Sequence, residues 1–591
     1  MLVILNAQSA FRVGLVFLFA LSLVLILIPN DSTAKAEEVK ISKEELKRFE
    51  GNYKVDVHPE PFRFFVKDGK LYLKRGGLEG SGQEVPLISQ GDGKFVIDPD
   101  HPNMFKFKVK GDKVEFTLYS MGNPIPGYRL EEKKPKPGDV AAKKTEKGAK
   151  EPRKAEKTRA DILAEIAKLE PKFKKDSSNV KVRFKYGELL YQSGEFWQAR
   201  DVITPLVRAA EPSSEALSLA AKLEYLLGNY SEAEKLYKQL IEAKAGDVSG
   251  QVMAKVGLVF TYDQTNQYDR VKELKFPPGV KLPNLEVMKA FEEKPYQKEW
   301  HNEEKVSVVP FLMTDPLPVL TIEFNGVPIQ VIFDTGANAF ILDNEIAAAM
   351  GIEWNSKAMG TFGGGLKAEV GFGKVDSVKL GDVTLKQVPI AILPTKRFSS
   401  AFDGGKYILG GFIGTAALRQ FLSTLDYKNG QLILRERTKE NASKLREELK
   451  DRIAAEVPFV LSATHMMMAR GSLNDKDGLT FFVDSGLASD ACFTAPIQTL
   501  EYVGIPVPET KISEDSVGGG GGKWASGLFP IKTIGLGSLT QFEVKGSYGE
   551  QTHASYWRLG FIRDGLISHK FLRQYSSWTL DFESMKYIFE K

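Results

Sequence analysis

The sequence has little cysteine, little histidine and little net charge, and each shortage excludes a class of protein. The single cysteine, Cys492, cannot form a disulfide within the chain, so folding does not depend on an oxidising compartment. Six histidines without paired ligand spacing argue against a zinc site, and we expect no metal and no other cofactor. A net charge of +4 is small for 591 residues and argues against a nucleic-acid partner.

The N-terminus has the pattern of a targeting segment. Arg12 precedes an apolar run at 13–29, and the polar stretch after it ends in Ala-Lys-Ala at 34–36. This pattern predicts a secretory signal at 1–36, with an uncleaved anchor as the alternative, because the run is long for a signal and short for a membrane span. Either interpretation places the rest of the chain outside the cytoplasm, periplasmic or secreted, without further membrane contact.

A chain of this length is too long for one core, so several domains are expected. Residues 40–131 alternate short apolar strands with turns such as Asp68-Gly69, which predicts a small β-barrel or sandwich. No catalytic constellation is visible there, and the pattern favours an accessory or binding module. Residues 132–158 are rich in Lys, Pro, Ala and Gly, which is typical of a solvated basic linker.

Residues 159–275 have the pattern of paired helices. Gly194 and Phe196 recur as Gly228 and Tyr230, 34 residues later. This register resembles the tetratricopeptide family, whose stacked helix pairs offer a concave surface to extended peptides. The resemblance implies a surface for a protein partner, and a structural spacer is the alternative.

The C-terminal half contains a long internal repeat. Its duplicated motifs are Val-Pro-Phe at 309–311 and 457–459, Asp at 334 and 484, Leu-Arg-Gln-Phe/Tyr at 418–421 and 572–575, and Leu-Asp-Tyr/Phe at 425–427 and 580–582. Their order is preserved, and the offset grows slowly from 148 to 155 residues, as small loop insertions would make it grow. We interpret this pattern as a tandem duplication of one domain, at 305–437 and 455–591.

Each repeat contains an acidic triplet after an apolar strand. Asp334-Thr335-Gly336 follows the run at 331–333, and Asp484-Ser485-Gly486 follows the run at 481–483. Two carboxyls about 3 Å apart share one proton, because like charges that close cannot both ionise. Such a pair can activate a water with one acid and bind a scissile carbonyl with the other.

Both repeats resemble retropepsin-like aspartic protease domains. In the first, Asn325-Gly326 predicts a hairpin that delivers Asp334, and the stretch at 408–414 resembles the hydrophobic-hydrophobic-Gly element behind the catalytic loop. In that family each domain supplies one Asp and one flap. The resemblance therefore implies two mainly-β lobes, an intramolecular pseudo-dimer and a peptide or protein substrate.

The resemblance also implies a role for each candidate site residue. The catalytic acids would be Asp334 and Asp484, the dyad-supporting residues Thr335, Gly336, Ser485 and Gly486, and the flap residues Gly363, Gly364, Gly365, Gly519 and Gly520. A hydroxyl after each Asp can bond across to the other loop, and the glycine allows a tight turn. Glycine-rich hairpin tips suit flaps that close over a peptide.

Three departures leave the function open. Asn338 and Ala488 stand where viral members often carry an acid, and Ser568 replaces the glycine that ends the matching element of the first repeat. An inactive peptide-binding or scaffold protein is therefore the alternative to an endopeptidase, and a protein acting through its helical repeats is a third class. We also expect residues 305–591 to fold and cleave short peptides without residues 37–275.

Overall fold

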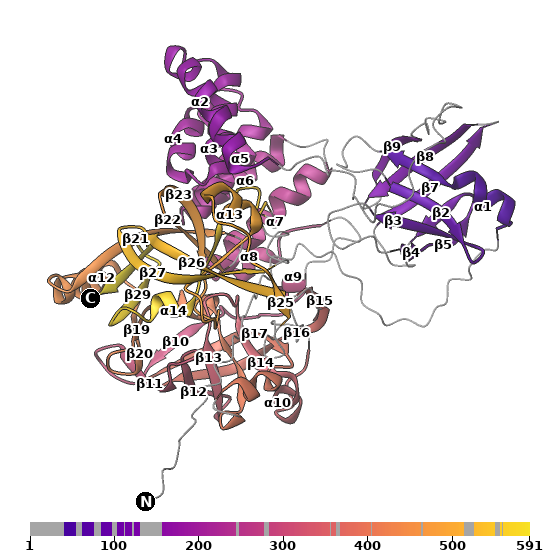
Figure 1. Ribbon diagram of the computed structural model, residues 1–591. Helices are drawn as coiled ribbons and strands as arrows, with labels where there is room; N and C mark the ends of the chain where they lie inside the picture. The colour runs from indigo at the N-terminus through magenta and orange to yellow at the C-terminus, as the bar shows by residue number, and fades with distance from the viewer. Residues whose placement is uncertain are drawn as a thin grey trace, which may run out of the picture. The chain divides into compact units, whose positions relative to one another are not determined.

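The architecture comes from a computed structural model of the chain (Figure 1). It describes residues 41–54, 62–75, 84–96, 103–110, 113–120, 123–129, 157–243, 248–276, 283–354, 356–361, 367–402, 405–462, 465–512, 525–549, 556–557 and 559–591. The chain forms two compact units, one containing Lys157–Phe276 and Pro283–Lys591, the other lying mainly within Ile26–Glu156. No helix in the described ranges is both long and apolar enough to cross a membrane.

The smaller unit is a β domain with one helix. Its elements are α1 (Lys43–Phe49), β1 (Gly51–Lys54), β2 (Phe62–Lys67), β3 (Lys70–Arg75), β4 (Glu84–Pro86), β5 (Ile88–Gly91), β6 (Lys94–Val96), β7 (Asn103–Lys110), β8 (Lys113–Ser120) and β9 (Asn123–Arg129). The strands pair in the order β4-β3-β2-β1-β9-β8-β7-β6-β5. Alternate side chains bury an aromatic core in which Phe64 contacts Tyr53, Phe107 and Phe116.

The larger unit begins with a helical segment, residues 157–276. Its helices are α2 (Arg159–Lys175), α3 (Val180–Ser193), α4 (Phe196–Val207), α5 (Ser214–Leu226), α6 (Tyr230–Ala243), α7 (Val248–Gln264) and α8 (Tyr268–Val271), and α9 (Pro283–Lys289) follows. Thr158 and Asp161 form a capping box that starts α2. Three of these helices are followed by a residue in the left-handed conformation. These residues are Gly194 (φ 88°), Gly228 (φ 79°) and Asn266 (φ 56°).

Lobe 1 (305–437) and lobe 2 (455–591) contain matching series of elements. Lobe 1 has β11 (Val306–Met313), β12 (Val319–Phe324), β13 (Val327–Phe333), β14 (Phe340–Asp343), α10 (Asn344–Ala349), β15 (Ser356–Thr361), β16 (Lys367–Leu380), β17 (Val383–Leu393), η1 (Lys396–Ala401), β18 (Leu409–Ile413), α11 (Thr415–Leu418), β19 (Phe421–Asp426) and β20 (Gln431–Glu436). Lobe 2 has β21 (Ile453–Ser462), β22 (Met466–Leu473), β23 (Lys476–Val483), β24 (Phe493–Ala495), α13 (Ile497–Val503), β25 (Lys511–Ile512), β26 (Ala525–Leu536), β27 (Leu539–Gly549), β28 (Gly565–Ile567), α14 (His569–Leu572), β29 (Ser577–Asp581) and β30 (Lys586–Glu590). Outside the two series, β10 (Gln297–Trp300) pairs with β17.

The pairings repeat as well as the elements. In lobe 1, β13 runs parallel to β18 and β14 runs parallel to β17, and in lobe 2, β23 and β24 pair in the same way with β28 and β27. Strands β19 and β29 pair antiparallel, so the lobes share one sheet in the order β11-β20-β19-β29-β30-β21. A single hydrophobic core runs through both lobes.

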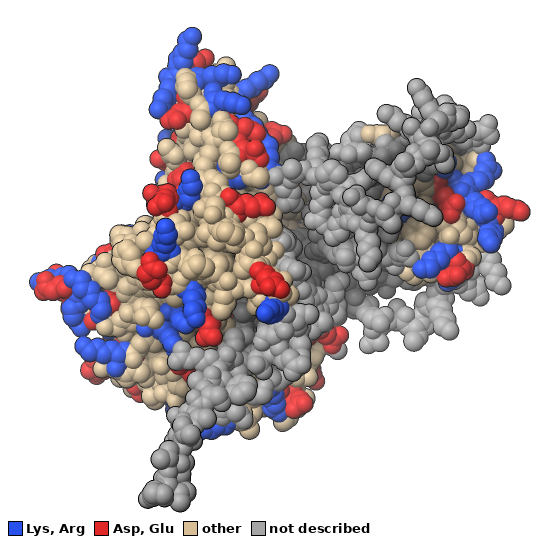
Figure 2. Space-filling view, in the orientation of Figure 1, with Lys and Arg blue, Asp and Glu red and all other residues tan. Residues whose placement is uncertain are grey.

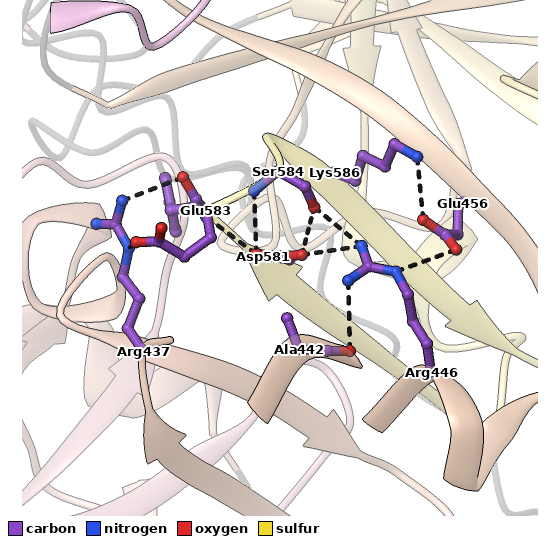
Figure 3. A network of polar contacts seen from close by, with 9 residues as sticks. Arg437, Ala442, Arg446, Glu456, Asp581, Glu583, Ser584 and Lys586 are labelled. Carbon is purple, nitrogen blue, oxygen red and sulfur yellow. Dashed lines mark hydrogen bonds and ion pairs between the residues drawn. The ribbon is translucent and has the colours of Figure 1, made fainter. Parts of the chain in front are cut away.

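The connector between the lobes is held by a polar network around α12 (Lys439–Leu449), shown in Figure 3. Arg446 donates to Asp581 at 2.9 Å and to Glu456 at 3.2 Å, while Arg437 donates to Glu583 at 2.8 Å. Asp581 is buried and also accepts two backbone N–H groups of its own hairpin turn. Its repeat counterpart Asp426 accepts the Asn429 N–H, so this repeated acid shapes turns.

The helical segment packs on both lobes, and Figure 1 shows it against the lobe 2 strands. Arg159 forms a buried ion pair with Asp564 of lobe 2, and Asp263 pairs with the buried Arg419 of lobe 1. The independence of residues 305–591 stays a prediction, and this packing adds a cost to it, because removing the helices would leave buried charges without partners.

Charged side chains of both signs intermix on the surface of the larger unit, as Figure 2 shows around α2 and α12. On the helices they form short-range pairs such as Lys174 with Glu170 and Lys444 with Glu440. These exposed pairs contribute little to stability, since solvent screens them.

Candidate active site

The two acidic triplets meet at the junction of the lobes. Asp334 follows the last residue of β13, and its N–H donates to the Ile413 carbonyl of β18 at 3.0 Å. Asp484 follows β23 in the same way and donates to the Ile567 carbonyl of β28 at 2.9 Å. Both side chains are fully buried. Each acid is thus placed by a pair of parallel strands in its own lobe.

Reciprocal hydrogen bonds tie the two loops together. The Thr335 N–H donates to the Ser485 hydroxyl, and the Ser485 N–H donates to the Thr335 hydroxyl, both at 2.9 Å. Each hydroxyl then donates to the carbonyl before the opposite Asp, Thr335 to Val483 at 3.0 Å and Ser485 to Phe333 at 3.4 Å. Buried polar groups are thereby satisfied across the interface, and the two loops are fixed in register.

The glycines of the triplets make room for the acids. Gly336 N–H donates to Asp334 Oδ1 at 2.7 Å, and Gly486 N–H donates to Asp484 Oδ1 at 3.0 Å. A Cβ atom at Gly336 would lie 2.6 Å from Asp484 Oδ1, and one at Gly486 would lie closer still to Asp334 Oδ1. Each glycine therefore packs against the opposite carboxyl, which only a residue without a side chain permits.

Burial keeps this pair from ionising fully. Loss of solvation raises the pKa of Asp334 to about 7, and the N–H groups of Gly336 and Ala337 oppose that rise. Burial also raises the pKa of Asp484 well above its ordinary value, and the negative charge of Asp334 raises it further. The positive charge of Arg563 lowers the pKa of Asp484. The pair therefore retains a proton at pH values well above the range in which exposed carboxyls titrate.

One oxygen of each acid is available for chemistry. The Oδ2 atoms of Asp334 and Asp484 accept no hydrogen bond from the described part of the chain. A buried carboxyl oxygen needs a partner, which can be a shared proton, a water or, for the protonated acid as donor, a substrate carbonyl. This arrangement can place a water between an ionised and a protonated acid.

The structure locates some of the other sequence candidates. Gly363, Gly364, Gly365, Gly519 and Gly520, the flap candidates, lie outside the described residues. Asn338 is partly buried and its carbonyl accepts the Ala416 N–H, so it supports the loop beside Asp334. Ala488 is buried and carries no charge toward the site.

A histidine that joins the lobes beside the site was not predicted from the local sequence motifs. His569, in α14 of lobe 2, is buried, and its Nε2 lies 2.9 Å from the Thr314 carbonyl of lobe 1. Its Nδ1 lies 3.4 Å from the Tyr427 hydroxyl, which accepts the Trp578 indole N–H. Burial lowers the pKa of His569 to about 4, so the ring is neutral and donates to Thr314. Only the repeat alignment, which places His569 opposite Thr415, could have drawn attention to it.

Part of the chain is similar to a known protein family and to a solved structure. Residues 320–412, which include Asp334 and most of lobe 1, match a family model described as aspartyl protease. A solved structure of a retropepsin-like aspartic protease from Rickettsia conorii is 19% identical, covers 24% of this chain and 92% of that chain, and has a TM-score of 0.16. No curated protein matches the chain.

Proposed function

We propose that the chain is an exported aspartic endopeptidase whose single dyad consists of Asp334 and Asp484. The observation that carries this proposal is the reciprocal bonding of the two triplets, with each loop's hydroxyl satisfied by the other loop. Burying two carboxyls against each other costs stability, and for each acid the effect of burial on the pKa is larger than that of any hydrogen bond or charge near it. An arrangement kept at that cost fits catalysis.

Hydrolysis would use the two acids in different protonation states. The ionised member removes a proton from a water, and the resulting oxygen nucleophile attacks the carbonyl carbon of the scissile bond. The protonated member donates a hydrogen bond to the carbonyl oxygen, where negative charge develops. The acid that took the proton from water then gives a proton to the amide nitrogen, the C–N bond breaks as the carbonyl re-forms, and the two products leave a singly protonated dyad.

Export and partner binding belong to the proposal as well. The apolar run and the Ala-Lys-Ala sequence within 1–36 support passage through the secretory route. The helical segment and the β domain would recruit larger substrates or a protein partner. Because the turns after α3, α5 and α7 rest on the lobes, the other faces of the helices would serve this role.

Two substitutions test the dyad. We expect Asp334→Asn and Asp484→Asn each to abolish cleavage of an unstructured peptide library between pH 4 and 7, by about 10³-fold or more, because an amide neither ionises nor acts as a base. Asp426→Asn is the matched control, since it removes a carboxylate that shapes a turn away from the dyad. Circular dichroism would verify that all three variants fold.

The outcomes separate the alternatives. Near-normal turnover by Asp484→Asn would show that the first triplet works in a homodimer and would refute the single-chain dyad. Folded wild-type protein that binds a statine-containing peptide without cleaving any library member would be a peptide-binding protein. Loss of activity in the control as well would point to a general effect of carboxylate removal on the fold.

A further inference from the structure

The two lobes hold corresponding loops in different ways. In lobe 1 the loop between β17 and β18 is fixed by lobe 1 itself. Asp343 is buried and accepts the backbone N–H groups of Thr395 at 2.7 Å and Lys396 at 2.9 Å. At the other end of the loop, the Ser399 hydroxyl accepts the Leu409 N–H at 2.9 Å, at the start of β18. Strand β18, which supports Asp334, therefore has an anchor within its own lobe.

Lobe 2 has no carboxylate at the matching position. The matched registers of β14 and β24 place Pro496 at the position of Asp343, and each is the N-cap of the following helix. The proline side chain can accept no hydrogen bond. The loop before β28 bonds instead to the helical segment, where Ile562 N–H donates to the Gln192 carbonyl at 2.9 Å. The Tyr191 hydroxyl donates to the Leu559 carbonyl at 3.1 Å.

This loop and the first two helices also share a small apolar core. Tyr556 and Ile562 of lobe 2 pack there with Ile162 of α2 and Leu189 of α3. The ring of Phe561 meets the rings of Tyr191 and Phe196 edge to face. The helical segment therefore provides the support for lobe 2 that lobe 1 provides for itself.

Arg159 is the polar centre of this contact. It is 2% exposed, its Nε donates to Asp564 Oδ1 at 2.8 Å, and a second nitrogen bonds Asp564 Oδ2. Its Nη1 also donates to the Gly478 carbonyl at 3.2 Å and to the Ser193 carbonyl at 3.1 Å. One guanidinium thus binds the residue before β28, the backbone of β23 and the end of α3.

Asp564 in turn joins the two strands that place the second acid. Its Oδ2 accepts the Thr480 N–H at 2.7 Å, and its own N–H donates to the Thr480 carbonyl at 2.8 Å. Thr480 lies on β23, which ends at Asp484, and β28 accepts the Asp484 N–H at Ile567. A change in the spacing of β23 and β28 would therefore move Asp484 relative to Asp334.

We propose that Arg159 is a positioning residue of the protease site, which holds β23 and β28 together behind Asp484 through Asp564. The proposal rests on the function proposed above for its effect on turnover. Without Arg159, Asp564 would be a buried carboxylate without its cation, and the strands would separate to hydrate it. Displacing an acid by a fraction of an ångström is enough to impair catalysis while leaving substrate contacts in place.

The test uses the full chain and three variants. Arg159→Met removes the charge and all the hydrogen-bond donors of the guanidinium. Arg159→Lys keeps the charge, but its single amine cannot reach Asp564, Gly478 and Ser193 together. Asp263→Asn is the control, because it loosens the other buried arginine contact of the helical segment, with Arg419 of lobe 1. The readouts are kcat and KM on one cleaved peptide, and hydrogen exchange of the amides in β23 and β28.

We expect Arg159→Met to lower kcat by about tenfold or more with KM within about twofold, because positioning affects the transition state more than binding. Exchange should rise in β23 and β28 but not in the lobe 1 counterparts β13 and β18. Arg159→Lys should lower the unfolding temperature less than Arg159→Met does and lose an intermediate part of kcat. Asp263→Asn should leave kcat and the exchange of β23 unchanged.

Several results would overturn the proposal. Unchanged kcat in Arg159→Met, or equal exchange increases in both lobes, would show that Arg159 stabilises the fold without positioning the site. If Arg159→Met does not fold, wild-type kcat in Arg159→Lys would have the same meaning. If the wild-type protein cleaves no peptide, the proposed function fails, and hydrogen exchange alone decides whether Arg159 holds the two strands.

Discussion

The buried dyad predicts an unusual dependence of stability on pH. A carboxyl whose pKa is raised in the folded state binds more protons there than in the unfolded chain between the two pKa values. Folding stability therefore falls as pH rises from the ordinary pKa of 3.8 through the folded value of about 7 for Asp334. At about 1.4 kcal/mol for each tenfold change in proton affinity, the loss reaches about 4 kcal/mol above neutral pH.

Asp334→Asn removes this loss. The amide has nearly the shape of the acid, its oxygen can still accept the Gly336 N–H, and it has no charge to desolvate. We expect the variant and the wild type to unfold at similar temperatures near pH 4. At pH 8 the variant should unfold several degrees higher, because each kcal/mol shifts the unfolding temperature of a large domain by about 2 °C.

Calorimetry of the full chain across this range is the assay, with Asp426→Asn as the control that should show no such gain. Asp484→Asn should behave like Asp334→Asn, because the charge of each acid opposes ionisation of the other. A stability difference that stayed constant with pH, or that favoured the wild type at pH 8, would refute the reasoning. It would mean that solvent reaches the dyad and that both acids ionise freely.

Two further predictions concern the contacts around the dyad. Thr335→Ala should lower the free energy of unfolding in urea by about 1–3 kcal/mol, because it leaves the Ser485 N–H and the Val483 carbonyl without a partner, whereas Thr335→Ser should keep most of the stability; equal losses in both variants would assign the effect to the methyl group. His569→Gln, which can still donate to Thr314, should be more stable relative to the wild type at pH 4 than at pH 7, and calorimetry at the two pH values would show this.

Much of lobe 1 could be predicted from the sequence because its signals are local. Asn325-Gly326 has positive φ at both residues, 46° and 80°, and joins strands β12 and β13, as the dipeptide predicts. Asp334 follows β13 directly. The meeting of Asp334 and Asp484 is what the resemblance of both repeats to retropepsin-like domains implies, because in that family each of two domains supplies one Asp.

The contacts by which the helical segment supports lobe 2 could not be predicted from the sequence in the same way. Arg159 and Asp564 lie 405 residues apart, and neither stands in a motif. Pro496 directly precedes a short helix, and nothing in the local sequence relates it to Asp343. Only the strand registers align the two residues. The sequence assigns Gly194 to a 34-residue repeat register, and the structure adds that a side chain there would collide with Thr480 and Arg470. These are tertiary constraints, and local propensity does not encode them.

The dyad and His569 have opposite effects on stability over the same pH range. The folded pKa of His569, about 4, lies below its ordinary 6.5, so its contribution is lost as pH falls from 6.5 to 4. The contribution of Asp334 to stability is lost in the opposite direction, as pH rises from 3.8 to about 7. Because the pKa of Asp484 is raised as well as that of Asp334, the effect of the dyad outweighs that of His569, and the two slopes only partly offset each other. His569→Gln should therefore steepen the fall in unfolding temperature from pH 4 to pH 7, which calorimetry across that range would show.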